Sequence, residues 1–204
     1  MLFSVFMMGV CVQILERTNL GPDPCSAMNF GLSRMLGISF GTWQLLLNVV
    51  LFLLIFWQNK SLFGLGSIGN MVVVGYAADF TGWVLDCLGL MPATKEMPLI
   101  QSVGIMLPTL VLFSFVAAIY MNCGLGTAPY DALPYLLHQK IEKAAKKTIP
   151  FKAIRMSYDG LVTLVALLVG GSVGVVTVFM IFLLGPFIDM VSRLIEKSGI
   201  FKSE

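Results

Sequence analysis

Long apolar stretches alternate with short polar connections along almost the whole chain. Six stretches are candidate membrane spans: residues 2–15, 38–57, 62–85, 99–122, 151–169 and 173–194. A helix needs about 20 apolar residues to cross a bilayer, and only the first stretch is clearly short. The pattern therefore predicts an all-α membrane protein with six transmembrane helices.

The chain also consists of two related halves. Residues 19–27 return as residues 124–132, with Leu, Gly, Pro and Ala coinciding, and residues 39–48 match residues 150–159. Three further pairs coincide in one register: Gly64 with Gly174, Gly75 with Gly185, and Asp79 with Asp189. Because each half holds three spans, an odd number, the halves are expected to lie in opposite orientations across the membrane as an inverted repeat.

We divide the chain accordingly into a first repeat, a linker, a second repeat and a tail: residues 1–90, 91–98, 99–196 and 197–204. In the repeat register, the first copy has no counterpart of residues 99–105. Either the first helix is short, or the protein begins upstream of Met1.

Each repeat carries a Gly-x-x-Pro turn, defined by Gly21 with Pro24 and by Gly126 with Pro129. Glycine permits a sharp backbone turn, and proline suits the first position of a helix. A short extra helix is therefore expected after each turn, at residues 24–36 and 129–143. Since a helix rises about 1.5 Å per residue, neither is expected to cross a core of about 30 Å, which favours six spans over eight.

The beginning of each short helix is suited to binding a small anion, because the first N–H groups of a helix have no internal partner. In the alternative interpretation, Asp23 caps the first short helix, and Ser26 and Asp131 turn back onto their own backbones. Ser26 continues a polar stripe along its helix, as Asp131 does with His138 in the second copy. These faces either line a vestibule or face interfacial water.

A second polar group lies deeper in the predicted spans. Gln44 and Asn48 stand one helical turn apart, and their counterparts in the second copy are Arg155 and Asp159. An ionised Asp159 at this depth costs several kcal/mol unless it is paired or hydrated. Arg155 is placed to pair with it at i, i+4. The two interpretations are a local ion pair and a site for a substrate or a proton.

Asp79 and Asp189 each follow a glycine by four residues. In the inverted arrangement they lie near opposite membrane faces. They are candidates for symmetry-related gates, and the alternative is that each is a helix-end acid satisfied by interfacial water.

Composition narrows the class of protein. The chain is 57% hydrophobic and 12% charged, with a mean hydropathy of +0.89, which is typical of an integral membrane protein. Its four cysteines have no Cys-x-x-Cys spacing, and its single histidine leaves little for a metal site or a catalytic triad. We therefore expect no enzymatic activity, no cofactor, no metal and no nucleic-acid partner. The expected partners are the lipid bilayer, an unidentified small solute, and a second copy or another membrane protein.

Basic residues crowd one connection: Lys140, Lys143, Lys146, Lys147, Lys152 and Arg155. By the positive-inside rule this connection is cytoplasmic, and six spans then place both termini in the cytoplasm. The simplest interpretation of residues 140–147 is a solvated loop, or a helix that lies on anionic lipid.

Four motifs stand out along the two copies: the Gly-x-x-Pro-x-Asp-type turn, the amphipathic helix, the Ser-Phe-Gly-Thr start of a span, and a Gly-x-Gly-Ser/Thr motif followed nine residues later by glycine. The residues that carry them are Gly21, Pro24, Gly64, Gly66, Ser67, Gly75 and Asp79 in the first copy, and Gly126, Pro129, Asp131, Gly174, Thr177, Gly185, Pro186 and Asp189 in the second. Together these motifs resemble the YczE/YyaS/YitT-like family of bacterial integral membrane proteins. The chain departs from the pattern at Ser26 and Val176. The resemblance implies a multi-pass protein of the bacterial plasma membrane, in a family sometimes suggested to contain transporters.

The sequence thus predicts a transporter-like protein that moves or binds a small polar or anionic solute at the interface of its two repeats. The residues expected to bind the solute are Arg155, Asp159, Gln44, Asn48, Asp131, Ser26 and His138. The alternative is a non-transporting accessory or substrate-capture protein that binds a ligand or a protein partner.

Overall fold

The computed structural model describes residues 1–91, 97–182 and 190, and within them every regular element is a helix. The predicted all-α class is therefore confirmed. The helices are α1 (Leu2–Arg17), α2 (Pro24–Leu36), α3 (Phe40–Phe56), the short 3₁₀ helix η1 (Lys60–Leu62), α4 (Leu65–Cys87), α5 (Leu99–Asn122), α6 (Pro129–Ala145) and α7 (Phe151–Leu168). Residues 175–182 are helical as well.

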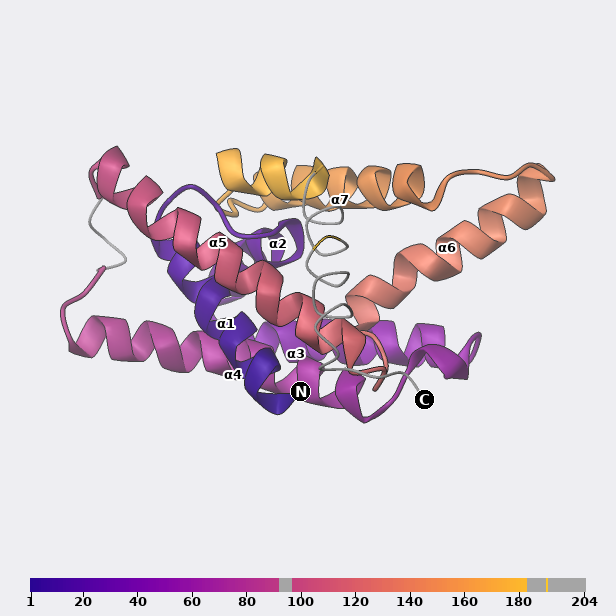
Figure 1. Ribbon diagram of the computed structural model, residues 1–204, viewed down its shortest axis with the longest axis horizontal. Coiled ribbons are helices and arrows are strands. Elements are labelled where there is room, and N and C mark those ends of the chain that lie inside the picture. Colours follow the sequence, from indigo (N-terminus) through magenta and orange to yellow (C-terminus); the bar gives the residue numbers. More distant parts are fainter. Residues whose placement is uncertain (92–96, 183–189, 191–204) are drawn as a thin grey trace.

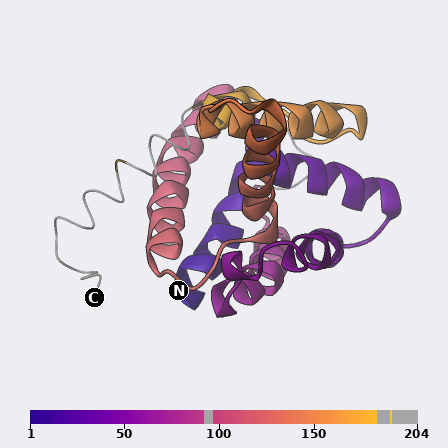
Figure 2. The same cartoon turned by 90° about the vertical axis from the view of Figure 1, so that its right-hand side faces the viewer.

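The helices form two outer layers with a crossing pair between them. Figure 1 shows α4 along the lower edge and α7 along the upper edge, with α1 and α5 crossing the space between. Figure 2 shows the same separation from the side. Helix α1 packs against α4 and α5, α3 against α4, α2 against α7, and α6 against α3. Each short helix thus packs against a long helix of the other half.

Local sequence sets the ends of the bent pair α2 and α3. Pro24 occupies the first turn of α2, and the Asp23 carboxylate accepts the Ser26 N–H. Gly37 ends α2 in the left-handed conformation at φ 68°, which glycine adopts without strain. Ser39 then caps α3 by accepting the Thr42 N–H. The result is a bend of 112° between the two helices.

The two Gly-x-x-Pro turns hold the halves together. In each turn a backbone carbonyl accepts a hydrogen bond from the other half. The Val176 N–H donates to Leu20 O over 3.0 Å, and the Gly66 N–H donates to Leu125 O over 2.8 Å. Thr177 adds a hydroxyl bond of 2.8 Å to Pro22 O. Each turn is therefore fastened by the beginning of a helix from the opposite half.

One apolar core joins both halves. Its buried members are Cys11, Val12, Leu15, Phe30, Phe40, Ala78, Phe113, Val176 and Met180. The Phe30 and Phe40 rings stack at 4.0 Å, which packs the bent pair onto this core. Because residues from both halves contribute, neither half encloses this core alone.

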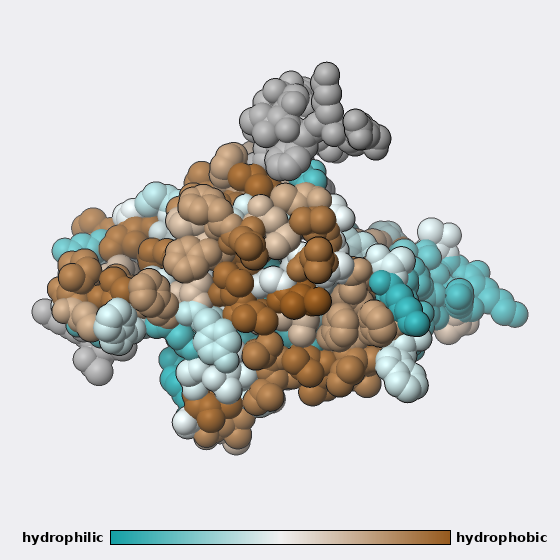
Figure 3. All heavy atoms as spheres, turned by 90° about the horizontal axis from the view of Figure 1, so that it is seen from below, coloured by the Kyte–Doolittle hydropathy of each residue, from teal (hydrophilic) through white to brown (hydrophobic). Residues whose placement is uncertain are grey.

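Among the described residues, α4 and α5 are long and apolar enough to cross a membrane, and the bent pair α2 and α3 makes a third span if it is counted as one. Helix α1 has only 16 residues, and α7 carries Lys152, Arg155 and Asp159. The predicted span at 173–194 lies partly outside the described residues. Figure 3 shows a broad apolar face and a hydrophilic projection on one side. The six-span arrangement stays a prediction.

Candidate functional site

Four side chains at the start of α6 and in the first half of α7 form one hydrogen-bonded group, which we call the Arg155 cluster: Tyr130, Asp131, Arg155 and Asp159. Arg155 Nε donates to Asp159 Oδ2 over 2.9 Å, and Arg155 Nη2 donates to Asp131 Oδ1 over 2.8 Å. The Tyr130 hydroxyl donates to Asp159 Oδ1 over 2.8 Å. One guanidinium is thus shared between two carboxylates.

Helix geometry explains why these residues meet. Arg155 and Asp159 are one turn apart on α7, where side chains at i and i+4 are neighbours. Pro129 begins α6 and places Tyr130 and Asp131 in its first turn, where the helix dipole favours a carboxylate. The Arg155 side chain is 28% exposed and that of Asp159 is 10% exposed, so both ions depend on their protein partners more than on water.

Aromatic rings close one side of the Arg155 cluster. The Arg155 guanidinium carbon lies 5.7 Å from the centre of the Tyr130 ring, within the range of a cation–π contact. The Tyr130 and Tyr158 rings lie 5.0 Å apart. Phenol hydroxyls and ring faces beside a shared guanidinium are suited to holding a small polar molecule.

Asp23 adds a third carboxylate within electrostatic range. Burial raises the pKa of Asp23, hydrogen bonds from Ser26 lower it, and the charges of Asp131 and Asp159 raise it again. The net effect raises the pKa of Asp23 and so favours its neutral form, while Asp131 and Asp159 are the two carboxylates that contact Arg155. The start of α2 is also already capped by Asp23, so a solute anion would have to displace that carboxylate.

The structure places Ser26, Asn48 and Gln44 apart from the hydrogen bonds of the Arg155 cluster. Ser26 is buried and donates its N–H to Asp23 over 3.1 Å. Asn48 is buried in α3 and donates from Nδ2 to Gln44 O over 3.0 Å. Within the described residues, Gln44 Oε1 is buried without a hydrogen-bond partner, and no hydrogen bond joins Gln44 or Asn48 to the Arg155 cluster.

His138 fastens the end of α6 to the connection that follows it. Its Nε2 lies 2.8 Å from Ile149 O and 3.5 Å from Glu142 Oε1, and its ring meets Phe151 edge-on. These contacts account for the side chain without a solute. His138 is therefore a poorer candidate than the members of the Arg155 cluster.

Of the two predicted gating acids, Asp79 caps a helix. Its Oδ2 accepts the Gly41 N–H over 2.9 Å at the start of α3, where α3 and α4 approach closely. Asp189 lies outside the described residues. A gating role for either acid stays a prediction.

A second buried acid, which the sequence pattern did not single out, is Glu16 at the end of α1. Its Oε1 accepts from Arg34 Nη1 over 3.0 Å and from Ser172 Oγ over 2.6 Å, while no described residue pairs with Oε2. A charged residue at the end of the first apolar stretch was the available signal. The partner Ser172 lies in the other half, which spacing alone does not reveal.

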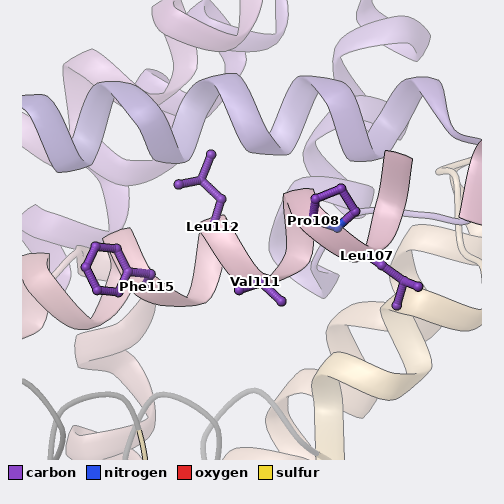
Figure 4. A pocket seen from close by; sticks show the side chains of 5 residues that line it. All are labelled: Leu107, Pro108, Val111, Leu112 and Phe115. Atoms are coloured by element: carbon purple, nitrogen blue, oxygen red, sulfur yellow. The ribbon is translucent and has the colours of Figure 1, made fainter. Parts of the chain in front are cut away.

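An apolar groove of about 520 Å³ runs along α5, and it is lined by Leu107, Pro108, Val111, Leu112 and Phe115. Figure 4 shows that all five belong to α5. The described residues that line this groove are all apolar, and an apolar lining does not suit a polar solute. Among the described residues, no three His, Cys, Asp or Glu side chains are grouped to hold a metal ion.

Comparison with known proteins gives one family and three relatives. The model of a family described as "Family of unknown function (DUF6198)" matches residues 1–193. An "Uncharacterized protein" of Haemophilus influenzae is 25% identical over 198 residues, covering 95% of this chain and 84% of the relative. The Bacillus subtilis "Uncharacterized membrane protein YczE" is 25% identical over 136 residues, covering 67% and 59%. The "Uncharacterized protein YyaS" of the same organism is 23% identical over 202 residues, covering 98% and 94%. No solved structure matches the chain significantly.

Proposed function

The chain belongs to the DUF6198 family of unknown function, and we propose that it is a transporter-like protein of a bacterial plasma membrane that binds and moves a small polar solute. The observation that carries the proposal is the Arg155 cluster, where one guanidinium is shared by two carboxylates in a chain that is 57% hydrophobic. Ionisable groups inside membrane helices are costly, and they commonly mark substrate or proton pathways. The name of the relative YczE, a membrane protein, supports the location.

We propose six spans in two inverted repeats, with both termini in the cytoplasm. The paired contacts at the turns support this arrangement. Leu20 O and Leu125 O occupy equivalent repeat positions, and each accepts an N–H from a helix of the other half. The exchanged packing of α2 on α7 and of α6 on α3 follows the same symmetry. Such repeats commonly bind their substrate at the interface between them.

The charge balance narrows the kind of solute. The sequence led us to expect a polar or anionic one, and Arg155 remains the group that would attract an anion. Asp131 and Asp159 already share that guanidinium, however, so two carboxylates face one cation. A solute with a positively charged or hydrogen-bond-donating group therefore fits the Arg155 cluster better than a simple anion.

Asp159→Asn is expected to abolish solute binding while the protein still inserts and purifies normally. Asn48 occupies the equivalent position of the other repeat, so an amide fits there, but it cannot supply the negative charge. The measurement is a thermal-shift screen of the purified protein against amino acids, amines and small carboxylates. A ligand at 100 times its Kd stabilises the folded state by about 2.7 kcal/mol.

Asp86→Asn is the matched control, because it neutralises a largely exposed acid that pairs with Arg17 outside the Arg155 cluster. A compound that stabilises the original protein should also stabilise the control and should fail with Asp159→Asn. If both variants respond fully, Asp159 is not part of the binding site, and the accessory or substrate-capture role becomes the better explanation.

A further inference from the structure

The end of α6 and its connection to α7 form a basic surface, defined here as residues 140–152. It carries five lysines against one glutamate: Lys140, Lys143, Lys146, Lys147 and Lys152, with Glu142. All five lysines are exposed, and no carboxylate of a described residue pairs with any of them. Glu142 is already engaged, since it accepts the Ile149 N–H over 3.1 Å. The positive charge of this surface is therefore uncompensated within the described structure.

One face of α6 changes from apolar to basic along its length. Ala132 and Leu136 on this face are buried against Ile55 of α3. Lys140 and Lys143 continue the same face one and two turns later, where they are exposed. From Lys140 to Ala145, the last residue of α6, the helix rises about 8 Å, close to the depth of one headgroup layer of a bilayer. The change matches a helix that leaves the hydrocarbon core at Leu136 and enters the headgroups.

A small pocket lies within the basic surface. Glu142, Lys146, Lys147 and Thr148 line it, and its volume is about 250 Å³. Two ammonium groups and a hydroxyl are donors suited to a phosphate ester. Figure 1 shows α6 running away from the other helices to this end, and the hydrophilic projection in Figure 3 lies at the same place beside the apolar face.

We propose that the basic surface docks on anionic phospholipid headgroups, with Lys146, Lys147 and Thr148 holding a lipid phosphate. Exposed Ile141, which is 39% accessible, stands beside the lysines and can enter the outer edge of the acyl region. This interaction would fix the depth of α6 and hence of Asp131 at its other end. It does not depend on whether the protein transports a solute.

The test titrates the purified protein in a neutral detergent with dioctanoyl phosphatidylglycerol, and separately with dioctanoyl phosphatidylcholine and sodium phosphate. Phosphatidylglycerol should bind more tightly than phosphatidylcholine and raise the unfolding temperature. K143Q/K146Q/K147Q should weaken phosphatidylglycerol binding by roughly 100-fold, since each lysine near an anionic surface contributes about a factor of five. Raising the salt concentration to 1 M should also weaken phosphatidylglycerol binding by the original protein.

Two control variants test whether the effect depends on the positive charge and on its position in the basic surface. K143R/K146R/K147R keeps the charge and should keep the binding, and K60Q removes an exposed lysine from the α3–α4 connection and should leave it unchanged. The proposal is overturned if K143Q/K146Q/K147Q and the original protein bind phosphatidylglycerol equally, or if both lipids bind equally. It is also overturned if sodium phosphate at millimolar concentration stabilises the protein as well as the lipid does, because the source would then be free phosphate.

Discussion

Replacing Gly126 by alanine is expected to destabilise the protein by about 3–5 kcal/mol, because backbone strain and steric overlap add. Gly126 has φ 97°, which alanine rarely adopts. A Cβ there would overlap the backbone nitrogen of Gly64 and lie 2.6 Å from Ser67 Oγ. These atoms belong to the start of α4 and cannot move without disturbing the bond between Gly66 N–H and Leu125 O.

Gly124→Ala is the matched control. Gly124 lies in the same connection with φ 63°, but no atom would stand within 4 Å of the added Cβ. Gly124→Ala should lower the free energy of unfolding by the backbone strain alone, about 1–2 kcal/mol. Thermal unfolding of the two purified variants measures the difference. If Gly126→Ala costs no more than Gly124→Ala, the fastening of this turn by the first half is wrong.

The second large effect is expected at Arg155. Arg155→Gln leaves Asp131 and Asp159 facing each other without their shared cation, and breaking such a partly buried pair costs about 3–5 kcal/mol. The double change R155Q/D159N reproduces the Gln44 and Asn48 pair of the other repeat. It should cost less than R155Q alone, because it also removes one of the stranded charges.

Unfolding temperatures of the two single variants and the double variant form the thermodynamic cycle. Asp86→Asn is the control, because its ion pair with Arg17 has a largely exposed acid and should matter less. Strictly additive losses for R155Q and D159N would mean that the two side chains are not coupled, and the description of the Arg155 cluster would fail.

Local chemistry was the part of the structure that the sequence revealed best. The Gly-x-x-Pro turns begin helices at Pro24 and Pro129, and Arg155 pairs with Asp159 one turn away, because these features depend on neighbouring residues. The family resemblance is confirmed by the family model and by YczE and YyaS among the relatives. Such signals are present in short windows of the chain.

Contacts between distant segments were not predictable in the same way. Tyr130 was not singled out, since a tyrosine beside a proline gives no hint of an acid 29 positions later. The Glu16 bond to Ser172 joins positions 156 residues apart. His138 shared a stripe with Asp131 in the sequence, yet its ring is held by the α6–α7 connection. Packing between the halves decided these cases.

The claim most central to the proposed function is that the two halves lie in opposite orientations across the membrane. Its most direct test introduces single cysteines at Lys60 and Lys95 of a cysteine-free variant and adds a membrane-impermeant thiol reagent to whole cells. Six spans in an inverted repeat predict label at position 95 and none at position 60, because of these two positions only Lys95, in the linker, then faces outward. Label at position 60 and none at position 95 would indicate eight spans and a parallel repeat, and would contradict the claim.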